Sequence, residues 1–439
     1  MRTRHLAWLA VVALPLVASA VQARVYIVKP DGTGDYRTIQ AAVDAVAIGD
    51  VIHLTAGTFR GTGNRDIDFR GKAIAVMGNC AYPESVRIDC QGSQQDPHRG
   101  FVFQTNEGAG SVLECLTVEN AYWTGNGGGM YCTGASPSVR DCVFRNCHAT
   151  FGGGASCSGS AVTLTNCVFS GDTADTGGAL YFYFCYSPSL DLTRCTFSSN
   201  SASVSSGAIF FWACQARLAG CTLCGNGGPN AAIALAHRSV VNLTNTIIAF
   251  GDRGASIWEE GGGTEADLTC CDIYGNAGGD WVPPIDGQLG QRGNIWADPL
   301  FCQDCVELGL QEDSPCAFEH NPSCGLIGAW PPCTPAAVAR QQPAGSFRLL
   351  PPLPNPSGGK TWIRYTAPSL GAVDPVVVGI YDPAGRLVRR LTGSPGPEFI
   401  HRIAWDGRDG EGRALPAGVY LTRIESGGKT AAGKVTLAR

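Results

Sequence analysis

The residues of this chain that could act as acids, bases or nucleophiles are thinly spread. Its nearest cluster of opposite charges comprises Asp172, Asp175, Asp191 and Arg194. Enzymes that hydrolyse glycosidic bonds need two carboxylates on either side of the bond, and lyases need a basic group that abstracts a proton. Turns and surface ion pairs use the same residue types, so we interpret this cluster as structural.

Cysteine is the second residue type that could carry out chemistry, because thiolates bind metals and thiols oxidise in pairs to disulfides. All 20 cysteines follow the first 23 residues, and their even number suits an oxidising compartment. Cys302 and Cys305 have the spacing of zinc ligands, but no matching His/Cys pair follows, so a disulfide is favoured. Outside the repeats described next, we expect disulfides at Cys80 with Cys90, and within the group Cys302, Cys305, Cys316, Cys324 and Cys333.

The other cysteines recur in a repeat that spans most of the first three hundred residues. Copies align on a run of the form Leu-x-x-Cys-x-Phe, at intervals of 25 to 28 residues. The recurring position is occupied by Cys115, Cys142, Cys167, Cys195, Cys221, Thr246 and Cys271. This period is too short for a propeller blade and lacks a 3.6-residue periodicity, so it predicts a solenoid of short strands. The sequence leaves open whether these cysteines are free or bridged.

Each repeat must contain a tight bend just before this position. Leu164 and Cys167 are three positions apart, so an uninterrupted strand would turn only one of them inward. Asn, Asp and Gly prevail at the residue before the cysteine, and they tolerate the left-handed conformation that a bend requires. Five residues after the cysteine comes a polar column whose side chains can bond along the axis: Asn120, Cys147, Asp172, Asn200, Asn226, Gly251 and Asn276.

With these features the repeats resemble a right-handed parallel β-helix of the pectin-lyase-like superfamily, in the style of polymorphic outer-membrane-protein and adhesin repeats. The resemblance rests on the glycine pairs and the Asn-Cys-x-Phe runs, as between Gly152 and Phe169. It implies a rod of about ten coils, and the right-handed sense comes from it alone. Residues 25–78 include an amphipathic helix and resemble the start of pectin methylesterases, so we expect a helical cap on the first coil.

Enzymes of that superfamily carry fixed catalytic motifs, and this sequence contains none of them complete. Asp96-Pro97-His98 resembles a short motif of uronate epimerases, but the surrounding pattern is missing. A tripeptide match is expected by chance in a chain of this length. We therefore assign no catalytic residue, and we expect no cofactor or metal site, calcium being the one ion left open.

Two successive strands are aromatic on both faces. Residues 180–185 read LYFYFC and residues 209–214 read IFFWAC, yet only one face of each strand can point into the coil. Counting back in twos from the cysteines, which we take as inward, places Phe182, Phe184 and Phe211 outside. Rings stacked about 4.8 Å apart would offer a platform for sugar rings or a patch for a partner. The alternative is a secondary core, covered by a loop or by the C-terminal domain.

The segments that flank the repeats differ in composition. Residues 1–23 have the basic start, short apolar core and small-residue end of a signal peptide, and this core is too short to span a bilayer. We expect the β-helix over 24–333, with its N-terminal cap and a disulfide-rich last coil. A linker rich in Pro, Ala and Gln follows over 334–345.

Residues 346–439 have the alternation and turns of an all-β domain. The runs Tyr381-Asp382 and Trp405-Asp406-Gly407 resemble the immunoglobulin-like C-terminal module of flagellar hook-capping proteins and type IX secretion sorting domains. That resemblance implies a sorting or attachment role and contact with secretion machinery. The domain has 13 Lys/Arg and 7 Asp/Glu, whereas residues 24–345 have 17 and 30, and the acidic repeats argue against nucleic-acid binding.

The sequence thus predicts an all-β protein, a β-helix followed by a small immunoglobulin-like β-sandwich. We expect it to be secreted or held at the cell surface, and not to span the membrane. The favoured function is binding, adhesive or structural, directed at a polysaccharide or a cell-surface partner. The alternative is a polysaccharide lyase, hydrolase or epimerase acting on acidic glycans, although an acidic rod is a poor host for polyuronates unless calcium bridges them.

Overall fold

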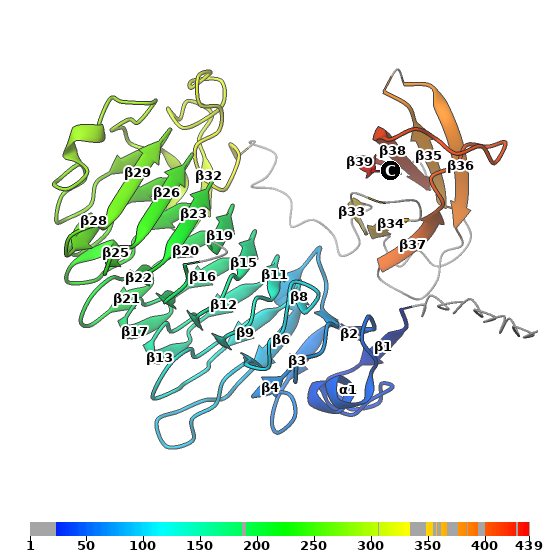
Figure 1. Cartoon of the computed structure of the whole chain (residues 1–439), viewed down its shortest axis with the longest axis horizontal. Helices are drawn as coiled ribbons and strands as arrows, with labels where there is room; N and C mark the ends of the chain where they lie inside the picture. Colours follow the sequence, from blue (N-terminus) through cyan, green and yellow to red (C-terminus); the bar gives the residue numbers. More distant parts are fainter. Residues whose placement is uncertain are drawn as a thin grey trace, which may run out of the picture.

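The repeats fold into a solenoid whose walls are parallel β-sheets (Figure 1). A computed structural model describes residues 23–186, 190–305, 307–333, 348–353, 357, 361–366, 376–383, 385–393, 400–426 and 429–438. The expected signal peptide lies outside these residues except for residue 23, and the expected linker lies wholly outside them. Each turn of the solenoid adds one strand to each wall, so residues one repeat apart become neighbours.

Three sheets form the walls. Sheet A contains β1 (Val25–Val28), β2 (Val51–Leu54), β5 (Ala75–Met77), β8 (Val112–Glu114), β11 (Ser138–Arg140), β15 (Thr163–Thr165), β19 (Leu190–Thr193), β23 (Gln215–Ala219), β26 (Val240–Thr244) and β29 (Glu265–Thr269). Sheet B contains β3 (Gly57–Phe59), β6 (Val86–Asp89), β9 (Thr117–Glu119), β12 (Val143–Arg145), β16 (Val168–Ser170), β20 (Thr196–Ser198), β24 (Thr222–Cys224), β27 (Ile247–Ala249) and β30 (Asp272–Tyr274). Sheet C contains β4 (Ile67–Asp68), β7 (Phe101–Phe103), β10 (Met130–Thr133), β14 (Ala155–Ser158), β18 (Leu180–Tyr183), β22 (Ile209–Trp212), β25 (Ala231–Ala236) and β28 (Ala255–Glu260).

Smaller elements complete the solenoid. The helix α1 (Ile39–Ala45) lies beside the first coil, as expected of a cap, and buries Ile39, Ala42 and Val43. A three-stranded sheet D joins sheets B and C in the middle coils. Its strands are β13 (His148–Phe151), β17 (Thr173–Thr176) and β21 (Ser201–Ala202), and the two 3-10 turns are η1 (Pro83–Ser85) and η2 (Asp286–Gln288). The predicted parallel β-helix is confirmed, whereas its superfamily and hand stay predictions.

The bend predicted before the recurring cysteine is present. Asp141, Asn166 and Arg194 precede the cysteines of three successive coils, and their φ angles are 52°, 53° and 51°. This left-handed residue resets the alternation, so that both Leu164 and Cys167 are fully buried. The phenylalanines two positions on stack inside, with ring centroids 5.0 and 5.3 Å apart.

In the first clear repeat the predicted alignment is wrong by one residue. Glu114 pairs in register with Arg140, so Cys115 is the counterpart of Asp141 in the bend. Cys115 has a φ of 63°, and Leu116 takes the buried position that cysteine occupies in later coils. The repeat motif placed Cys115 in the column because Val112 and Cys115 have the motif's spacing, whereas the pair in register with Val139 and Cys142 is Leu113 and Leu116.

The cysteines of the column are free thiols. The Sγ of Cys167 lies 3.5 Å from the carbonyl oxygen of Val139 in the coil before it, and Cys195 has the same contact with Leu164 at 3.5 Å. Each thiol is therefore a weak donor that links one coil to its predecessor. This geometry answers the question that the sequence left open.

Four disulfides lie elsewhere. Cys80 is bonded to Cys115, so its expected pairing with Cys90 is wrong, and Cys90 is a buried free thiol. The other three tie down the last coil: Cys224–Cys305, Cys270–Cys324 and Cys302–Cys333. Of the terminal group for which disulfides were expected, Cys316 is free and buried. Four bridges indicate maturation in an oxidising compartment.

The segment that carries these bridges folds over the outer face of sheet B. It includes β31 (Phe301–Cys305) and β32 (Glu307–Leu310), and it buries Ile247 of β27 against Phe301 and Ile327. At its end the indole Nε1 of Trp330 donates to the Oγ1 of Thr196, 2.9 Å away. The predicted closing coil thus forms a second small core outside the solenoid.

The C-terminal domain has two antiparallel sheets. One contains β33 (Arg348–Leu353), β34 (Thr361–Thr366) and β37 (Ile400–Trp405), and the other β36 (Leu387–Gly393), β35 (Val376–Tyr381), β38 (Gly418–Ser426) and β39 (Lys429–Leu437). Trp405, Tyr420 and Ile380 are buried between them. Trp405 donates to the carbonyl of Arg408 at 3.0 Å, so the segment that follows β37 is a hydrogen-bonded turn. The predicted β-sandwich is confirmed.

Candidate functional site

Sheet C carries the aromatic strands that the sequence singled out. Phe182 pairs in register with Cys157 and with Phe211, and both phenylalanines are fully buried in the core, their rings 5.3 Å apart. The prediction that Phe182 and Phe211 point outward is therefore wrong. Phe184 is 49% exposed, so for this residue alone the predicted orientation is confirmed.

A second left-handed bend explains the error. Phe184 and Ala213 have φ angles of 53° and 54°, and each stands between the end of its strand and the following cysteine. Because a left-handed residue resets the alternation, counting in twos across it reverses the two faces of the strand. Cys185 and Cys214 do point inward, as assumed, but the strand residues before the bend follow the opposite parity.

The outward residues of β18 and β22 form a stacked layer. Tyr181 lies against Phe210 with ring centroids 5.5 Å apart and an interplanar angle of 9°, and Phe210 is only 5% exposed. Phe151 of β13 covers Tyr181 from the side at 5.0 Å. Burial raises the pKa of Tyr181 to about 12. These rings cover one another and leave Tyr181 and Phe151 only partly exposed, so the outer residues of the strands themselves form a small secondary core.

Beyond the strand end the rings are accessible. Phe184 and Tyr186 are 49% and 44% exposed, and Phe184 lies 4.2 Å from Tyr183 and 6.3 Å from Tyr186 between ring centroids. Trp212 of the next coil lies 6.2 Å from Tyr183, and its far side is covered by His237 at 3.6 Å. We call Tyr183, Phe184, Tyr186 and Trp212 the aromatic patch.

Phe184 is an unusual residue for its place in the fold. The same bend in neighbouring coils is made by Gly159, Ala213 and His237, with φ angles of 56°, 54° and 55°. A large side chain in the left-handed region costs roughly 1–2 kcal/mol relative to ordinary backbone. Here the strained residue carries a half-exposed hydrophobic ring, so burial of the ring offsets little of the strain energy. Strain of this kind marks a candidate functional position.

A second cluster lies at the start of sheet C, around the Asp-Pro-His tripeptide. The Nδ1 of His98 is 2.6 Å from the Oδ2 of Asp66, and its Nε2 is 3.1 Å from the Oδ1 of Asp96. Asp66 also accepts from the backbone N–H of Arg99 at 2.8 Å. Asp66 therefore fixes the imidazole and fastens the loop that carries it to the sheet, whereas the Nε2 lies near Asp96 without forming a hydrogen bond.

Arg99 extends this cluster over the outer face of the sheet. Its guanidinium carbon lies 3.8 Å from the ring centroid of Trp123 and 4.6 Å from that of Tyr131, between two aromatic faces. It donates to the carbonyls of Asn126 and Gly127. Burial lowers the pKa of Arg99 to about 10, which still leaves it charged at neutral pH.

The four residues of the acidic–basic cluster named from the sequence bond to different partners. Asp172 is buried in the polar column, and Asp175 accepts from the hydroxyl of Ser203 at 2.7 Å. Asp191 binds the hydroxyl of Thr193, while Arg194 donates to the side chain of Asn166. Each of the four residues bonds to a group outside the cluster, so they do not form one acidic–basic site, and a structural role stays our interpretation.

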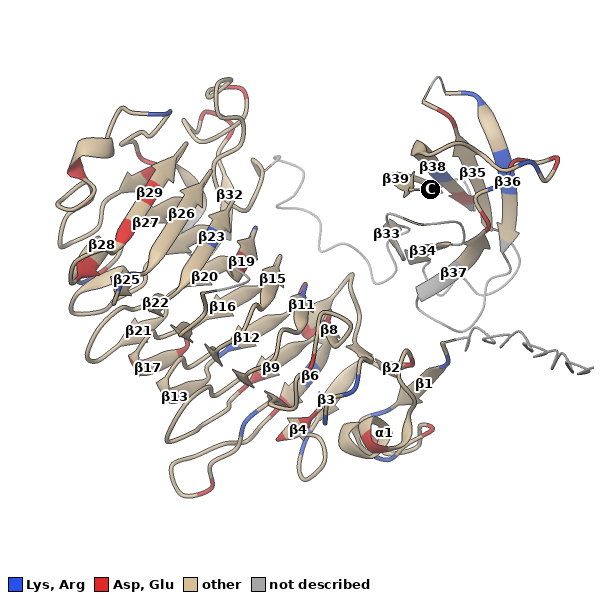
Figure 2. Ribbon diagram, in the orientation of Figure 1, with Lys and Arg blue, Asp and Glu red and all other residues tan. Residues whose placement is uncertain are grey.

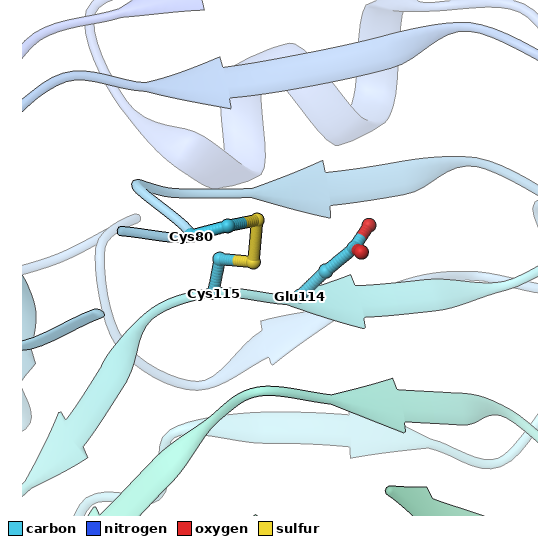
Figure 3. A group of neighbouring side chains, drawn as sticks. All are labelled: Cys80, Glu114 and Cys115. Atoms are coloured by element: carbon cyan, nitrogen blue, oxygen red, sulfur yellow. A yellow bond between two sulfur atoms is a disulfide. The ribbon is translucent and has the colours of Figure 1, made fainter. Parts of the chain in front are cut away.

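One group of possible metal ligands occurs among the described residues. Cys80, Glu114 and Cys115 lie close together, and Figure 3 shows the two sulfurs joined in a disulfide beside the carboxylate. A disulfide has no thiolate to offer a metal, and Arg140 lies 3.6 Å from the Glu114 carboxylate. Cys302 and Cys305 belong to two different disulfides, so the zinc interpretation of that pair is excluded as well.

Together the folds define a parallel β-solenoid protein with a C-terminal antiparallel β-domain. The family model of the FlgD Ig-like domain matches residues 358–430, so this part of the chain is similar to that domain. No curated protein and no solved structure matches the chain. Within the part of the chain that the structure describes, no helix has the length and apolar character to cross a membrane.

Proposed function

We propose that this is an exported, surface-associated β-helix protein that binds carbohydrate through the aromatic patch and is attached through its C-terminal domain. The observation that carries the proposal is Phe184, a half-exposed ring held in left-handed backbone. A ring in that position contributes little to the core, so packing does not explain why a phenylalanine stands there. Sugar rings, whose faces carry C–H groups, stack on exposed aromatic faces of this kind.

The rest of the patch supports a binding role. Tyr183 and Tyr186 add phenolic hydroxyls to the apolar faces, and such amphipathic rings are the usual lining of ligand sites. Exposed aromatic groups occur at the end of the β18 strand, whereas the neighbouring strand β14 ends in Ser158 and Gly159. The four disulfides support export. The similarity to the FlgD Ig-like domain supports an attachment or sorting role for the tail.

Replacing Phe184 by Gly tests the proposal directly. Glycine removes the ring and also the backbone strain, so the melting temperature should change little. Binding to a glycan array, or migration in gels that contain polysaccharide, should weaken roughly three- to tenfold, the worth of one aromatic contact. Phe318→Ala is the matched control, because Phe318 is 62% exposed and lies in the last coil. Equal binding by the Phe184→Gly and Phe318→Ala variants would refute the aromatic patch.

A second candidate function is acid–base chemistry on a glycan, as in a lyase, hydrolase or epimerase. The observation in its favour is His98, held between Asp66 and Asp96 and next to the Arg99–Trp123–Tyr131 stack. An Asp–His pair fixes an imidazole for proton transfer. The alternative interpretation is structural: Asp66 also accepts a hydrogen bond from the backbone of the His98 loop and so anchors that loop.

Product assays separate these alternatives. The full chain would be incubated with neutral and uronate polysaccharides, with and without calcium, and reducing ends and unsaturated products would be measured. An acid–base centre predicts turnover that His98→Asn abolishes and His320→Asn leaves intact. The absence of any product with the unmodified chain would remove this candidate and leave binding.

A further inference from the structure

The C-terminal domain presents an open sheet face that the proposed β-helix site does not involve. On the outer face of the four-stranded sheet, Tyr381 of β35 has Leu387 and Leu421 as its cross-strand neighbours. These leucines are 48% and 47% exposed, and Val419 on the same face is 45% exposed. Apolar side chains that are contiguous on a sheet face and exposed in this way mark an interaction surface.

A glycine lets the tyrosine side chain fold back along its own strand. A Cβ added to Gly379 would lie 2.8 Å from the Cε2 and Oη atoms of Tyr381, closer than any real contact. The ring therefore rests on the backbone of Gly379, two positions back on the same strand. Tyr381 is half-buried, so a part of its ring stays open to a ligand.

Cations flank this ring on both sides. Gly379 pairs in register with Arg390 on β36 and with Arg423 on β38, so the two guanidinium groups start from either side of the tyrosine. Lys434 is the cross-strand neighbour of Leu421 on β39. The nearest acid on this face, Glu425, pairs with Arg423 at 3.0 Å. Figure 2 shows basic segments on β36, and the domain as a whole has a net charge of +6 from 13 basic and 7 acidic residues.

We propose that this face binds an acidic polysaccharide, with a sugar ring stacked on Tyr381 and its carboxylates paired with Arg390 and Arg423. Charge complementarity selects a polyanion, because the domain has a net charge of +6 and Arg390, Arg423 and Lys434 lie on this face. A ring held against its own strand favours a sugar over a lipid surface, since membrane anchors bury protruding side chains among acyl chains. The inference gives the C-terminal domain a ligand of its own, and it holds whether or not the aromatic patch binds carbohydrate.

The test uses the full chain and polygalacturonate as the probe, in affinity electrophoresis or titration calorimetry at low salt. Tyr381→Ala should weaken binding roughly three- to tenfold, through loss of the stacking surface. Gly379→Ala should have a similar effect, because the new methyl group lifts the ring while all charges stay in place. Tyr381→Phe keeps the platform and should bind like the unmodified chain. Arg390→Gln should weaken binding about tenfold or more, through loss of a charged hydrogen bond.

Arg413→Gln is the matched control, because it removes one exposed cation of the same domain that is already paired with Asp409 in the turn after β37. An effect as large as that of Arg390→Gln would reduce the interaction to net charge and overturn the proposal. Failure to bind polygalacturonate would overturn it too, as would equal binding to dextran, to anionic phospholipid vesicles or to a single-stranded oligonucleotide. Phe318→Ala removes an exposed ring outside both proposed sites and should bind polygalacturonate like the unmodified chain. Any binding by the aromatic patch appears as a separate loss in Phe184→Gly, which adds to the loss in Tyr381→Ala.

Discussion

The backbone N–H of Asp172 donates to the Oδ1 of Asn200 at 2.9 Å, which joins an acid to the polar column of the solenoid. Asn200 in turn bonds to Asn226, and its Nδ2 donates to the carbonyl of Phe169 at 3.0 Å. Asp172 has no such donor: one carboxyl oxygen accepts from Cys147, and the other is buried without a hydrogen-bond partner. The column thus contains one acid at a position built for an amide.

Asp172→Asn is expected to stabilise the protein at neutral pH. Burial raises the pKa of Asp172 well above its ordinary value of 3.8, so the folded chain holds a proton that the unfolded chain releases. The contribution of Asp172 to the free energy of unfolding is then highest at low pH, and it falls as the pH rises from about 4 towards the raised pKa. The amide would supply the missing donor, and we expect a gain of about 1–3 kcal/mol in the free energy of unfolding at pH 7. Urea denaturation at pH 4 and pH 7 measures it.

Asn200→Asp is the matched control for that variant. It removes an amide whose donor is in use, so the free energy of unfolding at pH 7 should fall while that at pH 4 changes less. If both substitutions shift stability in the same direction at pH 7, the hydrogen-bond account of the column is wrong.

Asp272, in strand β30 of sheet B, gives a second pH dependence where the covering segment packs on this sheet. Its carboxylate is buried, accepts from the backbone of Ala297 and lies 3.1 Å from the thiol of Cys316. Burial raises the pKa of Asp272 to about 7. The folded state therefore gains stability from the proton at low pH and loses it between about pH 4 and pH 7. Asp272→Asn should flatten this part of the stability curve, while Asp286→Asn, in the 3-10 turn η2, should leave it unchanged.

Much of the fold was predictable because a solenoid repeats its geometry. The bend before Cys167 could be predicted from the parity of Leu164 and Cys167, and the Asn column from its spacing. The bend at Phe184 was missed because phenylalanine carries no signal for left-handed backbone, although Gly134 and Gly159 stand at the same position in earlier coils. That one residue reversed the assignment of Phe182 and Phe211.

The disulfides and the second cluster depend on neighbours that the sequence does not reveal. Cys80 and Cys115 have Cα atoms 4.5 Å apart across 35 residues, whereas the nearer Cys90 faces the core. Likewise Asp66 meets His98 only because β4 and β7 are adjacent in sheet C. Contacts between coils depend on the strand register. Predicting that register requires the length of every turn between the strands.

The two phenylalanines at the end of β18 should respond oppositely to truncation. Phe182 is fully buried and stacks on Phe211, so Phe182→Ala should lower the free energy of unfolding by about 3–5 kcal/mol. Phe184→Gly should change it by less than about 1 kcal/mol, because relief of the left-handed strain offsets the lost contact with Tyr183. Thermal or urea unfolding of the two variants distinguishes them. A large loss for Phe184→Gly would mean that this ring is part of the core.

Cysteine labelling tests the thiol column against the alternative of bridges along it. Twelve cysteines are free and all of them are buried, whereas eight form the four disulfides. In the folded chain we expect almost no alkylation, because a buried thiol is shielded from the reagent. In the column, burial also raises the pKa of Cys142 and of Cys195, the neighbours of Cys167. Denaturation without a reductant should expose twelve sites to the reagent, and a reductant should add the remaining eight. Mass spectrometry of the peptides assigns each site. Protection of Cys142 or Cys195 in the denatured, unreduced chain would show a disulfide between coils. The column would then not be a row of free, hydrogen-bonded thiols.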